Sequence, residues 1–325
     1  MIMDIALCHD NNYAPYSVVV MASIMEHNIE ESVTFHVLHT NLTEDRCQII
    51  QDWVETYDKK SIFFYKMEKL DFDDFPIDEH TYLDYGAYIR LFLGECLKGI
   101  DKVLYLDCDV IVNGSLKELW NMDISNYALA GIRDRINDYV HVYNRLRYSM
   151  AEGYINSGVM LINLKKWRND HFFDKAKEVA KAKGAKVLKN HDQDIINAIY
   201  HGQILFLPFK YNLLEYYLYT EEWLHLDRKY YPEIIEACKT PAIIHFCMPQ
   251  KPWHYECINS YKELYFKYRK MTPWPDVTLT HKFTKRSKKE KLKLFLEKLG
   301  LYKVERKSTL RKDVNTIEEP DNVLF

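Results

Sequence analysis

Residues 101–112 read DKVLYLDCDVIV, and this stretch decides how the chain folds. Its first half is a continuous apolar run, which is typical of a strand in a sheet that is covered on both faces. The run ends in Asp107 and Asp109, and three apolar residues follow. In a strand the side chains of residues i and i+2 point the same way, so we expect both carboxylates to face one point and Cys108 to face the opposite side.

The acidic pair has two interpretations. In a protein with 47 Asp and Glu residues, it can be the solvated end of a strand. The apolar residues on both sides favour a second interpretation, because two buried like charges are costly unless a cation neutralises them. Oxygen ligands suit Mg²⁺ or Mn²⁺. The pair is therefore a candidate metal site.

Seven further apolar segments have the character of buried strands. They lie at residues 3–8, 33–38, 61–65, 127–131, 158–163, 204–208 and 242–246. Helical patterns lie between them, at residues 14–28, 88–97 and 192–202. This alternation predicts an α/β sandwich, in which a central sheet is flanked by helices. Ligands bind such sheets beyond the carboxyl ends of the strands.

Length and composition limit the class of protein. The 325 residues, of which 47% are hydrophobic, are enough for one large domain with an appendage. The seven cysteines show no CxxC spacing, which argues against a structural zinc and against a disulfide framework. The N-terminus reaches polar and acidic residues too early for a signal peptide, and no apolar run has membrane-spanning length. We therefore expect a cytoplasmic protein.

Charge divides the chain into an acidic body and a basic tail. Residues 1–280 carry a net charge of −9, whereas residues 282–312 carry +10. Within the tail, a capping box at Ser287 and Glu290 begins a helical pattern that ends at Gly300. We expect a catalytic domain at residues 1–270 and a basic amphipathic helical tail at residues 271–325.

The tail has two interpretations that the sequence leaves open. It can pack on the body with its lysines in solvent, or lie on an anionic membrane surface through residues 282–312. Membrane contact would make the protein peripheral on the inner face of the cytoplasmic membrane, next to lipid-linked acceptors. No recognition motif for nucleic acid accompanies the charge, so we expect no nucleic-acid partner.

Polar residues near other strands are further candidates, each with an ordinary alternative. His245 would add an imidazole ligand and favour Mn²⁺, but most single histidines at strand ends are only half-buried polar residues. Lys251 can balance phosphate charge or lie on the surface. Asp10 and Asn12 can hydrogen-bond a nucleoside or cap the helix that follows. Arg90 is either a buried phosphate or ribose contact or a side chain that extends to solvent.

Six segments in a fixed order resemble glycosyltransferase family 8, which comprises bacterial galactosyl- and glucosyltransferases of lipopolysaccharide and surface-glycan synthesis and includes the glycogenins. The segments are MDIALCHDNNYAPY, YGAYIRLFLGECLKGIDKVLYLDCDVIV, LAGIRD, YINSGVMLINLKKWR, HDQDIINAI and HFCMPQKPWH. The resemblance covers about residues 3–255. It implies a GT-A fold with a mixed central sheet, a UDP-sugar donor, Mn²⁺ bound at a DXD motif, and hexosyl transfer with retention of configuration.

The resemblance also implies roles for individual residues. The metal ligands would be Asp107, Asp109 and His245. The catalytic group would be Gln193 beside the anomeric carbon, with Asp192 and Asp134 at the donor sugar. The remaining contacts to the UDP-sugar would come from Cys8, Asp10, Asn12, Tyr13, Arg90, Asp107, Cys108, Asn156 and Lys251. One departure is Met248, which stands where the family usually has a small residue, often glycine.

The residue types also bear on the mechanism. Retention requires either a double displacement or attack from the same face as the leaving group. Gln193 is an amide and a poor nucleophile, which favours same-face attack with Gln193 stabilising the cationic sugar. Two other functions are kept as alternatives: a nucleotidyltransferase that makes sugar nucleotides, and a UDP-sugar-binding homologue without turnover. The first would need a glycine-rich basic loop, and HDNNYAPY contains no glycine.

The membrane interpretation of the tail predicts lipid binding that depends on charge. Full-length protein should sediment with vesicles that contain anionic lipid and not with neutral vesicles, because each basic residue near an anionic surface contributes about 1 kcal/mol. Protein truncated at residue 280 should remain in the supernatant with both. Equal sedimentation of the two proteins would refute the membrane interpretation.

Overall fold

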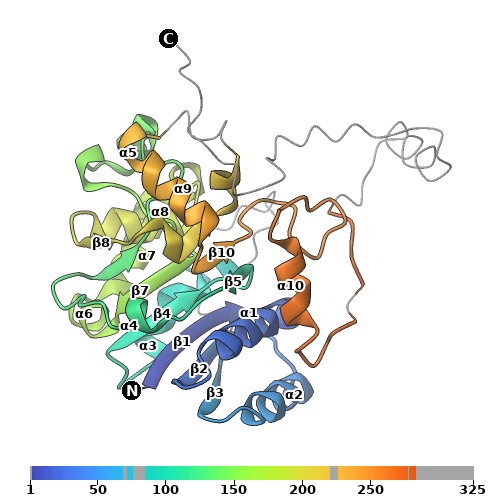
Figure 1. Cartoon of the computed structure of the whole chain (residues 1–325). Coiled ribbons are helices and arrows are strands. Elements are labelled where there is room, and N and C mark those ends of the chain that lie inside the picture. The colour runs from blue at the N-terminus through green and yellow to red at the C-terminus, as the bar shows by residue number, and fades with distance from the viewer. Residues whose placement is uncertain (1, 69–71, 76–84, 220–225, 277, 283–325) are drawn as a thin grey trace, which may run out of the picture.

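The structure is a computed structural model that describes residues 2–68, 72–75, 85–219, 226–276 and 278–282. Its centre is a seven-stranded sheet in the order β3-β2-β1-β4-β7-β6-β8 (Figure 1). Strand β7 runs antiparallel to both of its neighbours, whereas the other pairs in this sheet are parallel. The sheet is therefore mixed. Its strands are β1 (Ile2–His9), β2 (Ser32–His39), β3 (Lys60–Lys66), β4 (Lys102–Leu106), β6 (Leu129–Gly131), β7 (Val159–Asn163) and β8 (Ile204–Phe206).

A second, three-stranded sheet has the order β5-β10-β9. Its strands are β5 (Val110–Val112), β10 (Ile243–His245) and β9 (Leu213–Leu214). All eight predicted strands are confirmed, seven of them in the large sheet and the eighth as β10. Strands β5 and β9 were not predicted as separate elements, because two or three residues are too few to show a periodic pattern.

Helices cover both faces of the large sheet (Figure 1). The α-helices are α1 (Ala14–His27), α2 (Glu44–Glu55), α3 (Leu93–Cys96), α4 (Lys117–Trp120), α5 (Val140–Leu146), α6 (Leu164–Asn169), α7 (Phe172–Val187), α8 (His191–Tyr200), α9 (Tyr231–Lys239) and α10 (Lys262–Arg269). The 3₁₀ helices are η2 (Tyr85–Ala87), η3 (Ile89–Phe92), η4 (Met150–Glu152), η5 (Phe209–Asn212), η6 (Glu215–Leu218) and η8 (Arg228–Tyr230). The predicted helical segments are found as α1, as η3 followed by α3, and as α8.

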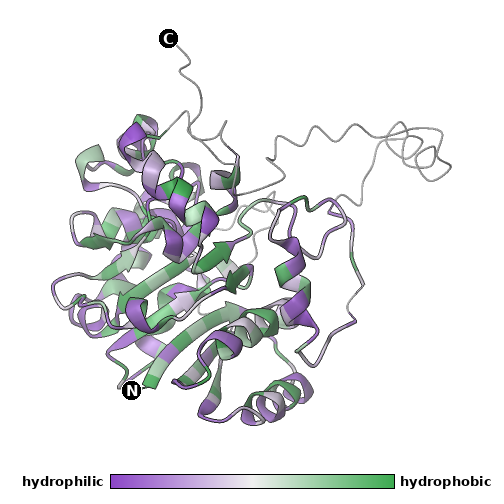
Figure 2. Ribbon diagram, viewed as in Figure 1, coloured by the Kyte–Doolittle hydropathy of each residue, from purple (hydrophilic) through white to green (hydrophobic). Residues whose placement is uncertain are grey.

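The position of β4 explains why its sequence is apolar without alternation. Leu104 and Leu106 pack in a core cluster with α1, α2 and α4, whereas Val103 and Tyr105 pack in a second cluster with η3, α6 and α8. All four side chains are at most 1% exposed. Figure 2 shows hydrophobic residues concentrated on the strands and hydrophilic residues on the outer helices. The predicted coverage of both faces is therefore confirmed.

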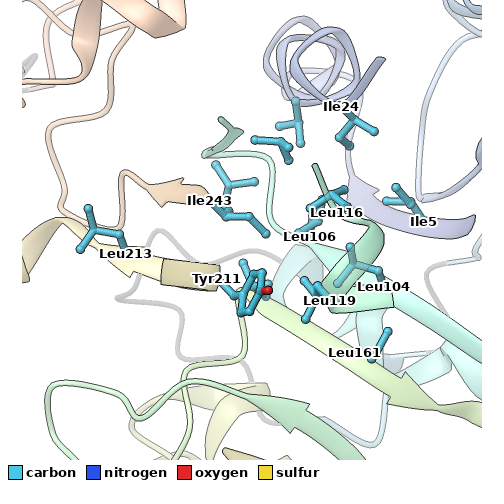
Figure 3. Packing of buried hydrophobic residues seen from close by; sticks show 14 of the residues in the cluster. Ile5, Ile24, Leu104, Leu106, Leu116, Leu119, Leu161, Tyr211, Leu213 and Ile243 are labelled. Carbon is cyan, nitrogen blue, oxygen red and sulfur yellow. The ribbon is translucent and has the colours of Figure 1, made fainter. Parts of the chain in front are cut away.

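The first core cluster also joins the two sheets (Figure 3). Leu104 and Leu161 come from the large sheet, Ile243 and Leu213 come from the small sheet, and Leu119 comes from α4. Because these residues are buried together, the small sheet is held at a fixed position beyond the carboxyl end of β4, where the acidic pair lies.

The first residues of the expected tail lie against the body. The backbone N–H of Thr280 donates to the carbonyl of Trp253 at 3.0 Å, and the N–H of Tyr255 donates to the carbonyl of Thr280 at 3.0 Å. The amphipathic pattern at residues 287–300 lies outside the described residues, so the tail remains a prediction.

Candidate active site

The acidic pair lies in a turn that connects the two sheets. Asp107, Cys108 and Asp109 follow the end of β4 and precede β5. The prediction that they belong to one extended strand is therefore wrong, because the chain leaves the large sheet here and enters the small one. The turn is fixed on both sides: the N–H of Asp107 donates to Gly158 O at 2.8 Å, and the N–H of Phe246 donates to Asp109 O at 2.9 Å.

The two carboxylates nevertheless converge with the predicted histidine. Single ligand atoms of Asp107, Asp109 and His245 all lie within 4.8 Å of one another. His245 Nε2 is 3.2 Å from Asp109 Oδ1 and 3.8 Å from Asp107 Oδ2. Two carboxylate oxygens and an imidazole nitrogen form a ligand set that fits Mn²⁺ well and Mg²⁺ less well.

Gly158 makes this close approach possible. A Cβ at this position would lie 2.3 Å from His245 Cε1 and 2.7 Å from Asp107 Oδ2. Both distances are far below van der Waals contact, so a side chain cannot be accommodated without moving two of the three candidate ligands. The glycine in YINSGV therefore supplies the space in which the ligand set is packed.

Arg90 balances the charge of Asp107 through an ion pair. Its guanidinium lies 2.9 Å from Asp107 Oδ1 and 3.2 Å from Asp192 Oδ2, and it stacks over the ring of Tyr105 at 4.6 Å. The Tyr105 hydroxyl donates to Asp107 Oδ1 at 2.6 Å. Arg90 is only 8% exposed, so the alternative that it extends to solvent is wrong. It holds the first carboxylate in place.

Lys251 balances the second carboxylate. Its ammonium group donates to Asp109 Oδ2 at 2.6 Å and to the carbonyl of Phe246 at 2.7 Å. Burial alone lowers the pKa of Lys251, but the Asp109 carboxylate outweighs this effect and the net pKa is raised. Burial likewise raises the pKa of Asp109, and Lys251 and His245 together lower it below its usual range. Both groups therefore stay charged, and the alternative of a surface lysine is wrong.

The residues expected at the donor sugar form one hydrogen-bonded group. Asp134 Oδ2 accepts from Asn156 Nδ2 at 2.9 Å and from Gln193 Nε2 at 3.3 Å. Gln193 Oε1 accepts from the backbone N–H of Ser157 at 3.0 Å. Strand β7 is antiparallel to β4, so the residues before β7 meet the turn after β4, and this topology brings Asn156 and Ser157 to the site.

Asp192 lies in the first turn of α8, next to Gln193. Its Oδ2 accepts from the Ser157 hydroxyl at 2.9 Å and pairs with Arg90. Burial raises the pKa of Asp192, and the charge of Arg90 offsets only part of that effect. Arg90 therefore joins the turn at residues 107–109 to the first turn of α8 through two carboxylates.

The predicted uridine contacts lie at the end of β1 and in the loop before α1. Asp10 Oδ1 accepts from the N–H of Tyr13 at 2.9 Å, and Asp10 Oδ2 accepts from Asn12 Nδ2 at 3.1 Å. Asp10 therefore shapes the entry into α1. The Cys108 thiol donates to the carbonyl of Cys8 at 3.5 Å, which attaches the end of β1 to the turn at residues 107–109.

Tyr13 faces the loop that carries Lys251. Its ring meets the Trp253 ring edge-on at 6.2 Å, and its side chain is 46% exposed. The neighbouring Tyr16 stacks on Trp253 at 3.8 Å. The end of β1 and the segment after β10 are thus adjacent.

Four residues at the site were missed because their roles depend on tertiary contacts. Ser157 and Gly158 lie within a quoted motif, but no local pattern shows that they touch Asp192 and His245. Tyr105 reads as an ordinary core residue. Asn212 directly precedes β9, which pairs with β10 and brings the Asn212 Oδ1 to 3.0 Å from His245 Nδ1.

The chain belongs to glycosyltransferase family 8. The sequence model described as "Glycosyl transferase family 8" matches residues 4–257. A Haemophilus influenzae protein named as a glycosyltransferase is 34% identical over 78% of this chain and 74% of its own length. A lipopolysaccharide 1,2-glucosyltransferase of Escherichia coli is 27% identical over 88% of this chain and 84% of its own length.

Solved structures identify the fold as GT-A. The galactosyltransferase LgtC, solved in complex with donor and acceptor sugar analogues, superposes with a TM-score of 0.73 and 28% identity over 89% of this chain and 99% of its own. A second LgtC structure, with the same TM-score, carries a glutamine-to-glutamate substitution in its active site. The protein is thus a glycosyltransferase enzyme of family 8. In the described part of the chain, every helix is too short or too polar to cross a membrane.

Replacing Gly158 with alanine should disrupt the ligand set and preserve the fold. Because the new Cβ would displace His245 and Asp107, we expect UDP binding in the presence of Mn²⁺ to weaken by about 10-fold or more, as measured by calorimetry. The matched control is Gly114→Ala, whose Cβ would meet only Ala242 at 3.8 Å. Unchanged UDP affinity in Gly158→Ala would contradict the assignment.

Proposed function

We propose that this enzyme transfers a hexose, galactose or glucose, from a UDP-sugar to a saccharide or glycolipid acceptor of the cell surface. The proposal rests on one observation above all: Asp107, Asp109 and His245 converge beside the charged Lys251. An acidic pair that could hold a metal, next to a partly buried charged ammonium, suits a diphosphate. The similarity to a lipopolysaccharide glucosyltransferase and to LgtC supports a glycan acceptor.

The leaving group would be stabilised at two places. Mn²⁺, when bound by Asp107, Asp109 and His245, would supply a Lewis acid for the negative charge that develops on the diphosphate. Lys251 would supply a second positive charge from the chain itself. Its ammonium group now donates to Asp109, and it would turn toward the β-phosphate with its charge intact.

The environment of α8 supports same-face attack with retention. Asp192 is bound by Arg90 and Ser157. Asp194 is 0% exposed, forms an ion pair with Arg145 and accepts from the Tyr154 hydroxyl at 2.7 Å. Both carboxylates are thus engaged and poorly placed for nucleophilic attack.

Gln193 lies between these two carboxylates in the sequence and offers an amide oxygen. That oxygen is oriented by the N–H of Ser157, so it can stabilise the cationic sugar without forming a covalent bond. The acceptor hydroxyl would then attack from the side on which the diphosphate departs. LgtC, which is 28% identical to this chain, also has a glutamine in its active site.

Met248 bears on acceptor selection. It is half-buried and packs against the main core cluster. Since the family usually has a small residue here, we propose that the methionine narrows the space beside the diphosphate or the acceptor. The basic residues 282–312 would bring the enzyme to a lipid-linked acceptor on the cytoplasmic side of the membrane.

A screen of UDP-sugars tests the proposed function. Without acceptor, the rate of UDP release from UDP-galactose or UDP-glucose should be highest with Mn²⁺ and lower with Mg²⁺. Release should stop with EDTA, because a cation must stabilise the charge that develops on the leaving diphosphate. Binding of UDP without release from any sugar would instead support a non-catalytic homologue. Formation of a UDP-sugar from UTP and a sugar phosphate would support the nucleotidyltransferase alternative.

Substitution of Gln193 separates chemistry from binding. Gln193→Ala should lower kcat by about 100-fold, because an oriented oxygen is lost from the transition state, and should leave UDP affinity nearly unchanged. Calorimetry with UDP and Mn²⁺ provides the binding control. Collapse of UDP binding in this variant would contradict the role of Gln193.

A further inference from the structure

A row of buried side chains connects the candidate metal ligand His245 to the sugar-side residue Asp134. His245 Nδ1 lies 3.0 Å from Asn212 Oδ1, and Asn212 Nδ2 lies 3.0 Å from Asn156 Oδ1. Asn156 Nδ2 in turn lies 2.9 Å from Asp134 Oδ2. All four residues are at most 9% exposed, and Asn212 is 0% exposed. The row is therefore shielded from water.

A single backbone group sets the direction of every hydrogen bond in this row. The N–H of Gly158 lies 3.0 Å from the Asn156 side chain. A backbone N–H can only donate, so the atom facing it must be the carbonyl oxygen Oδ1 of Asn156. The amide nitrogen Nδ2 then faces Asp134, whose carboxylate only accepts. Both ends of the Asn156 amide are thereby fixed.

The orientation of Asn156 determines that of Asn212. Asn156 Oδ1 can only accept, so Asn212 must present its amide nitrogen to it and its carbonyl oxygen to His245. A carbonyl oxygen requires a donor, so His245 Nδ1 must carry a hydrogen. The other ring nitrogen, Nε2, faces Asp109 Oδ1 at 3.2 Å and Asp107 Oδ2 at 3.8 Å, so it is the nitrogen that is left to bind a cation between the two carboxylates. A hydrogen on Nδ1 and a lone pair on Nε2 make up the tautomer that a metal ligand needs there.

We propose that Asn212 is a positioning residue that fixes the Nδ1–H tautomer of His245, and that Asn156, which is held by the Gly158 N–H and by Asp134, fixes the orientation of Asn212. The proposal rests on the proposed function in one respect, namely that Asp107, Asp109 and His245 hold a divalent cation. Metal affinity would then depend on two amides that do not touch the metal. Gly158 acts twice in this arrangement, through its N–H and through its missing side chain.

The tautomer can be measured directly by nitrogen NMR on the metal-free, full-length protein labelled at histidine nitrogens. His245 is assigned by loss of its signals in His245→Gln, at a pH where the ring is neutral. In the wild type the Nδ1–H form should dominate, and in Asn212→Ala the ring should become a mixture of tautomers. A dominant Nε2–H form in the wild type would overturn the proposal, whatever the variants do.

Metal affinity provides the second test, with Mn²⁺ titrated in the presence of UDP and without any sugar. Asn212→Ala should weaken Mn²⁺ binding by about 10- to 100-fold, the range for loss of a group that orients a metal ligand. Asn156→Ala should also weaken it, although Asn156 touches no metal ligand. The double variant should bind Mn²⁺ no more weakly than Asn212→Ala does, because both substitutions interrupt the same row of hydrogen bonds.

The matched control is Asn28→Ala, which removes another buried amide. Asn28 is 2% exposed and bonds the backbone of Leu116 and Ile24, away from the ligand set. It should lower the urea midpoint and leave Mn²⁺ affinity unchanged. If Asn212→Ala and Asn156→Ala both bind Mn²⁺ as tightly as the wild type does, the positioning role of Asn212 is refuted and the proposed function is not. If the wild type itself binds no Mn²⁺ in the presence of UDP, the proposed function is refuted.

Discussion

Asp107 and Asp109 bring two negative charges to the junction of the two sheets, and the rest of the site is arranged around their neutralisation. Arg90 pairs with the first and Lys251 with the second. Each of these cations comes from a different part of the chain, so the ion pairs also determine which loops meet. Breaking such a pair by removing one partner typically costs about 3–5 kcal/mol, because a charge is left buried without compensation. The electrostatic balance thus contributes both to the architecture and to the chemistry.

Arg90 has an additional consequence for the donor side of the site. Its guanidinium spans Asp107 and Asp192, so the turn at residues 107–109 and the first turn of α8 share one cation. The amide row through Asn212 and Asn156 makes a second connection, from His245 to Asp134, and Asp134 in turn accepts from Gln193. A change in the position of a bound cation would therefore be felt at Gln193 through rigid, buried contacts.

Much of the fold could be predicted from the sequence, because buried strands such as β4 are apolar on both faces and lie between recognisable helices. The candidate ligands could also be predicted, but the geometric reason given for the acidic pair was wrong. The rule that residues i and i+2 face the same way assumes a continuous strand, and the chain instead turns from β4 into β5. The turn holds Asp107 and Asp109 close together, and pairing of β5 with β10 brings His245 to them. Asn212, Ser157 and Gly158 could not be assigned, since their partners lie far away in the sequence.

The central claim is that Asp107, Asp109 and His245 hold a divalent cation against a nucleotide diphosphate. A crystal structure of the full chain grown with MnCl₂ and UDP, with anomalous data collected at the manganese edge, tests it most directly. The account predicts one strong anomalous peak bonded to Asp107, Asp109 and His245 Nε2, with the diphosphate oxygens on its open side and Lys251 turned toward them. A manganese ion bound elsewhere, or UDP bound away from this cluster, would contradict it.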